Sequence, residues 1–495
     1  MDALIVGRAI CGLGGASMYS RVMVLLSITI LDYEWPVYFG LCGLTWGTGT
    51  ILGPILGGAF TVSSATWRWH LQETPQTVNC DNIGKHCQID NYLSSQGLKS
   101  PSFDVDAPTE PLVPSDAPEI EAARSELIDA TLMLHDLILG PKEYLMKFTH
   151  DWLISMQAIG RFNIAKSIPI HEEVSYADIA KRCGVNELDV RRILRHAMTL
   201  RLFKEPKRGV VAHTAASRMI AEDQQMADWV ATTSDELWQA ATQTVNAMVK
   251  HPGSQEPNET GFALANGTDK SVFEVLSQNP PRAKRFGSAM KAWTEGTGYD
   301  LQYVIDNYSW KKVDNGTVVD VGGSHGFACT RLAKAFPDLN FIVQDLPPVI
   351  EAGAKTVPSE LSDKIKFMAY DFLKEQPVKN ADIYFFRWIF HNWSDKYCIQ
   401  ILRNQIPALK KGARIVINDN VLPEPGTMPR WREERLRSMD LTMLELQNSR
   451  ERELEDWAKL FEDADPRFTF KGGKQPAGSN LWILEAVWDG DSTTQ

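Results

Sequence analysis

A glycine-rich turn in the second half of the chain carries residue types that suit a bound cofactor. The stretch TVVDVGGSHGFACTRLAKAFP (317–337) predicts an apolar strand, a tight turn and an amphipathic helix. The turn holds Asp320, Gly322 and Gly326, and it lacks the GxGxxG spacing of a dinucleotide site. Glycines let the backbone approach a ligand closely. An acid followed by glycines at this spacing suits S-adenosylmethionine, which has no pyrophosphate to seat at a helix end.

Two acids follow at the ends of the next predicted strands. Asp345 ends LNFIVQD, 25 residues after Asp320, and Asp371 comes at the end of KIKFMAYDF. An acid at the position of Asp345 can accept hydrogen bonds from both hydroxyls of a ribose. Its alternative role is to cap a helix ahead of Pro347. The turn and the two acids together predict a site for S-adenosylmethionine.

A histidine lies just after the fourth predicted strand, in ADIYFFRWIFHNWSD (381–395). A single histidine in an apolar stretch is usually a satisfied core residue. His391, however, comes where the ligand side of a parallel sheet is expected, which favours a general base. Phenol and imidazolium differ by roughly 3 to 4 pKa units, so a positioned histidine can take a phenol proton as a new bond to oxygen forms. We expect no metal, because His391, Asp371 and Asp395 form no recognisable ligand set.

The elements that position these side chains alternate along the chain. A helix over 396–412 leads into a fifth strand, ARIVINDNVLP (413–423). Alternating strands and helices predict a parallel, doubly wound α/β sheet with ligands at the carboxyl ends of its strands. We therefore expect a Rossmann-like domain that binds S-adenosylmethionine over residues 311–495.

The stretch upstream, 119–225, predicts a winged-helix domain. Two helices, in VSYADIAKRCG and NELDVRRILRHAMTLRLF, precede a small hairpin in KEPKRGVVAHT. Such folds often bind DNA, and this stretch is locally basic. Its seven cations are Arg191, Arg192, Arg195, Arg201, Lys204, Lys207 and Arg208. The apolar residues of the second helix leave little of it free to enter a groove, so packing and dimerisation are favoured over DNA binding.

Residues 226–310 are predicted to be mostly helical and to form a substrate-pocket segment. They contain several large apolar side chains: Trp229, Trp238, Phe262, Met290 and Trp293. Each of these alone is typical of a core. Together they could wall a cavity for a flat molecule.

Composition narrows the class of partner. The formal net charge is −11, so the molecule as a whole is repelled by nucleic acid and by anionic lipid. The seven cysteines are scattered without CxxC spacing, which indicates free thiols in a reducing compartment. No cleavable signal peptide stands out at the N-terminus. We expect a cytoplasmic protein without a nucleic-acid partner.

Residues 1–70 differ from the rest because no charge occurs between Glu34 and Arg68. The run GLCGLTWGTGTILGPILGGAF (40–60) is a membrane-span candidate, since a crossing needs about 20 apolar residues. LIVGRAICGLGGA (4–16) and GTGTILGPILGG (47–58) resemble a piece of a major-facilitator transporter. A fused fragment and a membrane tether are both left open, and membrane contact is expected only here. Residues 71–118 are rich in proline, serine and acids, which predicts a linker.

Residues 317–455 resemble the cation-independent plant O-methyltransferases of the caffeate and flavonoid type and their fungal relatives that act on aromatic polyketides such as sterigmatocystin. The resemblance is carried by VVDVGGSHG (318–326), QDLP (344–347), YDF (370–372), RWIFHNWSD (387–395), INDNVLP (417–423) and RER (450–452). A weaker likeness extends back to about residue 85 and includes SPSFDVDAP (100–108). It implies a class I fold with a mostly parallel seven-stranded sheet, S-adenosyl-L-methionine as cofactor, a small aromatic hydroxylated substrate, and a homodimer formed through the winged-helix region.

Carried over by position, the resemblance also implies site residues. The cofactor contacts fall on Gly322, Gly323, Asp345, Asp371, Phe372 and Arg387, the last in place of a lysine. His391 matches the catalytic base, and Asp419 and Glu451 match the acids that flank it.

Two positions depart from the family pattern. Ser324 replaces a glycine of the turn, which should be tolerated if the φ of this residue is negative. Asn392 replaces the aspartate after the base and removes one possible charge beside it. Neither change excludes methyl transfer. The fold also includes non-methylating relatives, in which the cofactor only supplies charge during a decarboxylation or a pericyclic step, and that alternative is left open.

Overall fold

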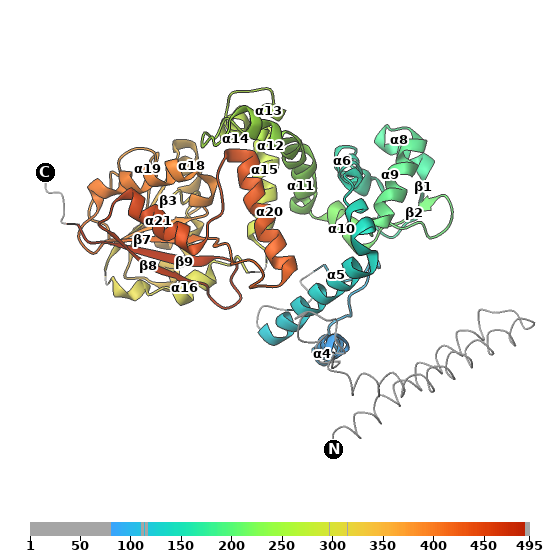
Figure 1. Cartoon of the computed structure of the whole chain (residues 1–495), viewed down its shortest axis with the longest axis horizontal. Helices are drawn as coiled ribbons and strands as arrows, with labels where there is room; N and C mark the ends of the chain where they lie inside the picture. Colours follow the sequence, from blue (N-terminus) through green and yellow to red (C-terminus); the bar gives the residue numbers. More distant parts are fainter. Residues whose placement is uncertain (1–80, 110–112, 114–116, 297, 314, 491–495) are drawn as a thin grey trace, which may run out of the picture. The chain divides into compact units, whose positions relative to one another are not determined.

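The computed structural model describes residues 81–109, 113, 117–296, 298–313 and 315–490 (Figure 1). The chain separates into two compact units, Met1–Asn79 and Cys80–Gln495, and the described residues all belong to the second. The apolar segment 1–70 and its expected likeness to a transporter lie outside the described residues. Within the described part, no helix combines the length and the apolar character that crossing a bilayer requires.

A seven-stranded sheet forms the centre of the second half of the chain (Figure 1). Five strands run parallel, and two antiparallel strands complete one edge. In spatial order they are β5 (Ile365–Ala369), β4 (Asn340–Asp345), β3 (Thr317–Val321), β6 (Ile383–Arg387), β7 (Arg414–Asp419), β9 (Trp482–Trp488) and β8 (Phe468–Lys474). The expected α/β fold with a mostly parallel sheet is confirmed.

Successive strand side chains point to opposite sides of the sheet. Both sides are buried. Val319 and Tyr384 join one core and their neighbours Val318 and Phe385 join the other. The first core is covered by α19 (Asp395–Gln405) and α21 (Leu454–Ala464), and the second by α16 (Gln302–Asn307), α17 (Phe327–Ala335) and α18 (Pro347–Gly353). This two-sided burial explains why the strands are almost wholly apolar in sequence.

A smaller helical region precedes the sheet. Its elements are α6 (Asp151–Arg161), α7 (Ile164–Ser167), β1 (Val174–Ser175), α8 (Tyr176–Cys183), α9 (Glu187–Thr199), β2 (Val210–Val211) and α10 (Ala215–Glu222). Ser175 and Asn186 cap α8 and α9, and Gly184 ends α8 at a φ of +68°. β1 pairs antiparallel with β2, and a bridge joins Lys204 to Ala212.

Carboxylates neutralise much of the basic stretch on this region. Arg191 pairs with Glu187, Arg195 with Glu205, and Lys207 with Glu173. A cation already paired in this way offers less to a phosphate backbone. This pairing weighs against the DNA-binding alternative.

The segment 71–118, expected to be a linker, contains a helix. Residues Asp81–Ser95 form helix α4, which packs on α5 (Pro118–Met146) through Ile89, Leu93 and Ala123. Further along, the carbonyl of Phe103 accepts a hydrogen bond from the N–H of Ala215. The proline- and acid-rich composition hid these few apolar residues, which suffice to dock the segment.

The segment 226–310 is mostly helical. It contains α11 (Gln224–Thr232), a π-helical turn (Thr233–Leu237), α12 (Trp238–Lys250), α13 (Gly261–Ala265), α14 (Val272–Ser277) and α15 (Pro280–Thr294). The buried carboxylate of Glu236, in the π-helical turn, accepts hydrogen bonds from Arg282 (2.7 Å) and Arg285 (2.8 Å). These bonds fasten α15 to the turn between α11 and α12. The last helix of the site, α20 (Arg430–Gln447), packs on α12 and α13.

Candidate active site

The turn after β3 has a shape that requires glycine. Gly322 and Gly326 have φ values of +76° and +74°, in the left-handed region that other residues rarely adopt. A Cβ on Gly322 would lie 2.4 Å from Cδ1 of Ile389, and one on Gly323 would lie 2.5 Å from Oδ2 of Asp320. The turn is therefore packed directly against the segment that carries His391.

The condition set for Ser324, a negative φ, is not met. Its φ is +51°, a conformation that costs a residue with a Cβ on the order of 1–2 kcal/mol. The N–H of Ser324 donates a hydrogen bond to Oδ2 of Asp345 at 2.9 Å. This bond to a carboxylate orients the peptide, so the glycine-like conformation of the turn is kept although the residue is serine.

Asp345 lies at the carboxyl end of β4 and faces the turn. Its Oδ1 accepts a hydrogen bond from the N–H of Leu346 at 2.7 Å. The alternative in which Asp345 caps the next helix does not hold, because Leu346 occupies the N-cap position of α18. Leu346 itself is 54% exposed, so an apolar surface is open beside a half-buried carboxylate.

Asp371 and Phe372 follow β5 at the same edge of the sheet. The Phe372 ring meets Trp393 edge to face at 5.6 Å between centroids, and its Cε1 lies 3.8 Å from the position of a Cβ on Gly322. Oδ1 of Asp371 accepts a hydrogen bond from the N–H of Leu373 at 3.0 Å. Phe372 therefore lies against the glycine turn.

Arg387, the last residue of β6, lies among polar groups below the turn. Its guanidinium donates hydrogen bonds to Asn418 and, at 2.5 Å, to the carbonyl of Tyr299. Burial lowers the pKa of Arg387 to about 10, although Asp320 and Asp419 oppose this change. Burial also raises the pKa of Asp320 to about 7.

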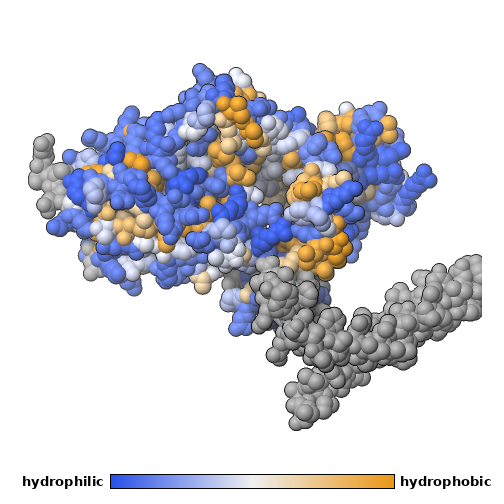
Figure 2. Space-filling model, in the orientation of Figure 1, coloured by the Kyte–Doolittle hydropathy of each residue, from blue (hydrophilic) through white to orange (hydrophobic). Residues whose placement is uncertain are grey.

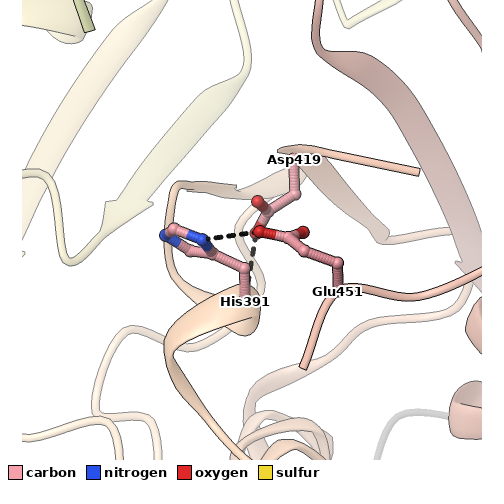
Figure 3. A group of neighbouring side chains, drawn as sticks. All are labelled: His391, Asp419 and Glu451. Atoms are coloured by element: carbon pink, nitrogen blue, oxygen red, sulfur yellow. Dashed lines mark hydrogen bonds and ion pairs between the residues drawn. The ribbon is translucent and has the colours of Figure 1, made fainter. Parts of the chain in front are cut away.

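His391 meets Asp419 and Glu451 in a buried cluster (Figure 3). Its Nδ1 lies 3.1 Å from Oε1 of Glu451, and its backbone N–H donates to Oδ2 of Asp419 at 3.2 Å. Figure 3 shows the other ring nitrogen, Nε2, pointing away from both carboxylates. Among the described residues, none forms a hydrogen bond with this nitrogen. The imidazole is thus hydrogen-bonded through Nδ1, while Nε2 has no partner among the described residues.

The charges in this cluster set its protonation. Burial lowers the pKa of His391, but the carboxylates of Asp419 and Glu451 outweigh it and leave the pKa above its usual 6.5. Burial raises the pKa of Asp419 to about 6, against the effect of the imidazole. The protonation of His391 and that of Asp419 therefore influence each other.

Arg452 fixes the segment that carries the histidine, and sequence reasoning did not single it out. Its fully buried guanidinium donates to the carbonyls of Phe390 (3.0 Å) and Trp393 (2.8 Å) and pairs with Asp395 at 2.7 Å. Both ends of the 390–393 turn are held by one side chain. The available signal was the RER pattern at 450–452. Its two arginines both pair with Asp395, whereas Glu451 between them contacts His391.

A row of aromatic rings leads away from His391, and two of its members, Tyr299 and Trp388, were also missed. Ring centroids are 5.0 Å apart between His391 and Trp388 and 5.4 Å between Trp388 and Tyr299. The row continues through Trp293, 6.3 Å from Tyr299, to Trp229, which stacks on it at 5.1 Å. Both Trp388 and Trp293 are partly exposed. Flat apolar surface therefore adjoins the imidazole.

The sequence was compared with known proteins. Residues 243–466 match the family model of the O-methyltransferase domain. The grayanic acid biosynthesis cluster O-methyltransferase of Cladonia grayi is 42% identical over 411 residues, 82% of this chain and 86% of the relative. The chlorophenol O-methyltransferase of Trichoderma longibrachiatum is 40% identical over 407 residues, 80% of this chain and 86% of the relative. This chain belongs to the O-methyltransferase family.

Several solved structures share the fold of this chain. OxaC in complex with sinefungin and meleagrin superposes with a TM-score of 0.64 at 22% identity, covering 82% of this chain and 98% of OxaC. LepI in complex with SAM gives 0.61 at 22% identity, over 82% of this chain and all (100%) of LepI. A structure titled a pericyclic reaction enzyme also gives 0.61 at 22%, over 82% and 98%. None of these proteins supports the transporter likeness of residues 1–70.

The protein is an S-adenosyl-L-methionine-dependent O-methyltransferase, and the residues around the turn fit that cofactor. Each oxygen of Asp345 accepts one backbone hydrogen bond and can accept another. Exposed Leu346 beside it offers an apolar surface to a base. The family match begins at residue 243, inside the helical segment, so the matched region starts well before the boundary expected at 311.

Replacing Asp320 with asparagine in this O-methyltransferase should make its stability less dependent on pH. Burial raises the pKa of Asp320 from 3.8 to about 7, so between these values the folded protein keeps a proton that the unfolded chain releases. The free energy of unfolding then falls as pH rises, by on the order of 2–4 kcal/mol, and the amide removes that fall. Urea unfolding at about pH 5 and about pH 8 measures the difference.

The exposed Asp338→Asn variant serves as the matched control. It should follow the wild type at both pH values. An identical pH slope in wild type and Asp320→Asn would contradict the buried, protonated carboxyl.

Proposed function

We propose that this O-methyltransferase methylates a hydroxyl of a small aromatic molecule with His391 as the general base. The observation that carries the proposal is the imidazole's arrangement: Nδ1 contacts Glu451, and Nε2 points away from both carboxylates and has no hydrogen-bond partner among the described residues (Figure 3). Ile389, two residues before it, packs against Gly322 of the turn. The base and the cofactor turn are therefore neighbours.

The cofactor residues follow from the same arrangement. We assign the contacts to Gly322, Gly323, Asp345, Asp371, Phe372 and Arg387, with Asp345 at the ribose and Asp371 and Phe372 at the adenine. S-adenosyl-L-methionine supplies an electrophilic methyl group on a sulfonium. The turn and Asp345 give the polar contacts, and Phe372 and Leu346 give apolar surface.

The chain's own groups then handle the proton. Nε2 of His391 accepts the proton of the acceptor hydroxyl while its Nδ1–H donates to Glu451. Glu451 and Asp419 stabilise the imidazolium that forms, which is why their charges raise the pKa of His391. Such proton transfer contributes about 10²–10⁴-fold in rate. Orientation of the reactants by the surrounding rings supplies more.

An aromatic acceptor is supported by two observations. The row of rings from His391 to Trp229 offers flat surfaces to a planar molecule. One relative is named for chlorophenol and another for the biosynthesis of grayanic acid. We propose that the acceptor is a phenolic secondary metabolite of polyketide type and that the enzyme acts in the cytoplasm.

A non-methylating role is the second candidate, because a pericyclic reaction enzyme shares the fold. Fold likeness at 22% identity carries no chemistry by itself. A base with two flanking carboxylates serves proton abstraction, which favours transfer. A mass gain of one methyl group on a phenol decides between the two.

We also propose that two copies form a homodimer through the winged-helix region, residues 119–225. Nine large apolar side chains lie exposed on α5, α6 and the turn between them, and Figure 2 shows hydrophobic residues gathered on that part of the surface. They are Leu132, Leu134, Leu137, Ile138, Leu145, Met146, Phe148, Trp152 and Ile154. Exposed apolar patches of this size mark interaction sites.

Sedimentation equilibrium should give twice the mass of the chain. Ile138→Glu should shift the protein toward monomer, because it places a charge where apolar surface would be buried. Val249→Glu, at an equally exposed apolar position on α12, should leave the dimer intact. A monomeric wild type would overturn the dimer.

Replacing His391 with alanine or glutamine should leave cofactor affinity unchanged and remove most methyl transfer, by about 10²–10⁴-fold. Calorimetry with S-adenosylhomocysteine and mass spectrometry of a phenol panel are the two measurements. The glutamine variant keeps a polar group beside the two carboxylates, so it guards against loss of folding. Full activity in either variant would remove the base assignment.

Asp345→Ala provides the opposite pattern and so separates the two roles. It should weaken cofactor binding strongly, because the ribose loses its acceptor.

His391, Asp419 and Glu451 could also hold a metal ion, since their ligand atoms lie within 4.8 Å of one another. Treatment with a chelator should leave activity unchanged if His391 acts as a base.

Glu451→Gln should move the acidic limb of the pH–rate profile to lower pH. The base works only when neutral, and the Glu451 carboxylate holds the pKa of His391 above 6.5. Removing that charge lowers the pKa, so the histidine stays neutral in more acidic solution. The maximal rate should fall at the same time, because the imidazolium loses a partner. A profile that keeps its midpoint would contradict the coupling, and Glu424→Gln on an exposed loop is the control.

A further inference from the structure

A cation that forms no ion pair among the described residues lies beside Trp293 of the aromatic row. The guanidinium of Arg435, on α20, lies 5.0 Å from the ring centroid of Trp293. Trp293 in turn lies beside Tyr299, and Tyr299 beside Trp388. Three aromatic side chains therefore separate this cation from the base.

Arg435 differs from the other arginines of its helix. Arg432 pairs with Glu121 and Arg437 with Glu433. Arg435 is exposed and, within the described part of the chain, forms no ion pair with a carboxylate. Its positive charge is thus free for a ligand, and its plane rests on an indole face.

The row also lacks hydrogen-bond acceptors for its own donors. Nε1 of Trp388 is buried and has no partner among the described residues. A buried N–H without an acceptor costs about 1–3 kcal/mol, and a ligand oxygen would remove that cost. Burial raises the pKa of Tyr299, which Arg435 opposes and Glu451 reinforces, so both charges act on its hydroxyl.

The two ends of the row therefore carry opposite charge. Glu451 and Asp419 flank the base, and the cation of Arg435 lies against Trp293. The other cation beside the row, Arg387, is already hydrogen-bonded to Asn418 and to the carbonyl of Tyr299. An anionic substituent beside His391 would be repelled by the two acids, whereas at Arg435 it would be attracted.

We propose that the acceptor is an aromatic carboxylic acid whose carboxylate pairs with Arg435 and whose remote phenolic hydroxyl reaches His391. The proposal rests on the function proposed above and names the substrate class of that site. The ring system lies along Trp293, Tyr299 and Trp388, and a carbonyl or ether oxygen of the acceptor receives the N–H of Trp388. Methylation falls on the hydroxyl, and the carboxylate leaves unmethylated.

The test compares a hydroxybiphenyl carboxylic acid, its two groups at opposite ends, with its methyl ester. Calorimetry on the protein loaded with S-adenosylhomocysteine should show the acid binding about tenfold more tightly than the ester, as expected for a guanidinium–carboxylate pair. Arg435→Gln should abolish that difference by weakening the acid alone. Arg435→Lys should keep part of it.

Lys284→Gln is the matched control, because it removes one exposed positive charge from the neighbouring helix α15. It should preserve the preference for the acid. In turnover, Arg435→Gln should raise KM for the acid and leave kcat nearly unchanged, since Arg435 contacts Trp293 and is not part of the His391 cluster.

Equal affinity for acid and ester in the wild type, or no binding of the acid, would overturn the inference. An equal loss for both compounds in Arg435→Gln would do the same, because it would indicate a structural role. Failure of the proposed function has a different signature: the acid binds with the expected preference, but no phenol gains a methyl group.

Discussion

Two carboxylates and an imidazole share one buried space at the ends of β6 and β7, and the site depends on their mutual neutralisation. Removing a carboxylate from water costs several kcal/mol unless it is paired and hydrogen-bonded. Glu451 has the imidazole as partner, and Asp419 has the backbone N–H of His391. Loss of the imidazole charge leaves two like charges in the core. His391 is therefore also the counterion of two buried carboxylates, and its raised pKa reflects their charge.

Such a cluster needs a rigid backbone to hold it. The turn after β6 supplies one, at a cost in conformational energy. Trp388 has a φ of +58°, which is unfavourable for a bulky side chain by about 1–3 kcal/mol. Arg452 holds the turn from below through the carbonyls of Phe390 and Trp393. The strained residue presents its indole to the imidazole and to Tyr299. One backbone distortion therefore sets both the base and the start of the aromatic row.

Local pattern was enough to predict part of this arrangement. The glycine turn, Asp345 and the five parallel strands depend on residues close in sequence. The location of His391 could be predicted because it follows the carboxyl end of a parallel strand, where ligands bind in such sheets. The meeting of His391 with Glu451, 60 residues away, came only from family likeness. Helix α4 was missed because few apolar residues dock it. The positive φ of Ser324 was missed because it accompanies a hydrogen bond that its N–H donates to Asp345 on the next strand. Long-range contacts decided each failure.

The frame of the fold does not select the chemistry, since a pericyclic reaction enzyme shares it. Selection must come from the charges set upon it. Aromatic faces contribute about 0.5–1.5 kcal/mol each without preferring one end of a flat ligand over the other. Direction then arises from the carboxylates beside His391 and from the cation of Arg435 beside Trp293. A planar acceptor with one acidic end can lie along this row in only one favourable sense, and that sense brings its neutral hydroxyl to the base.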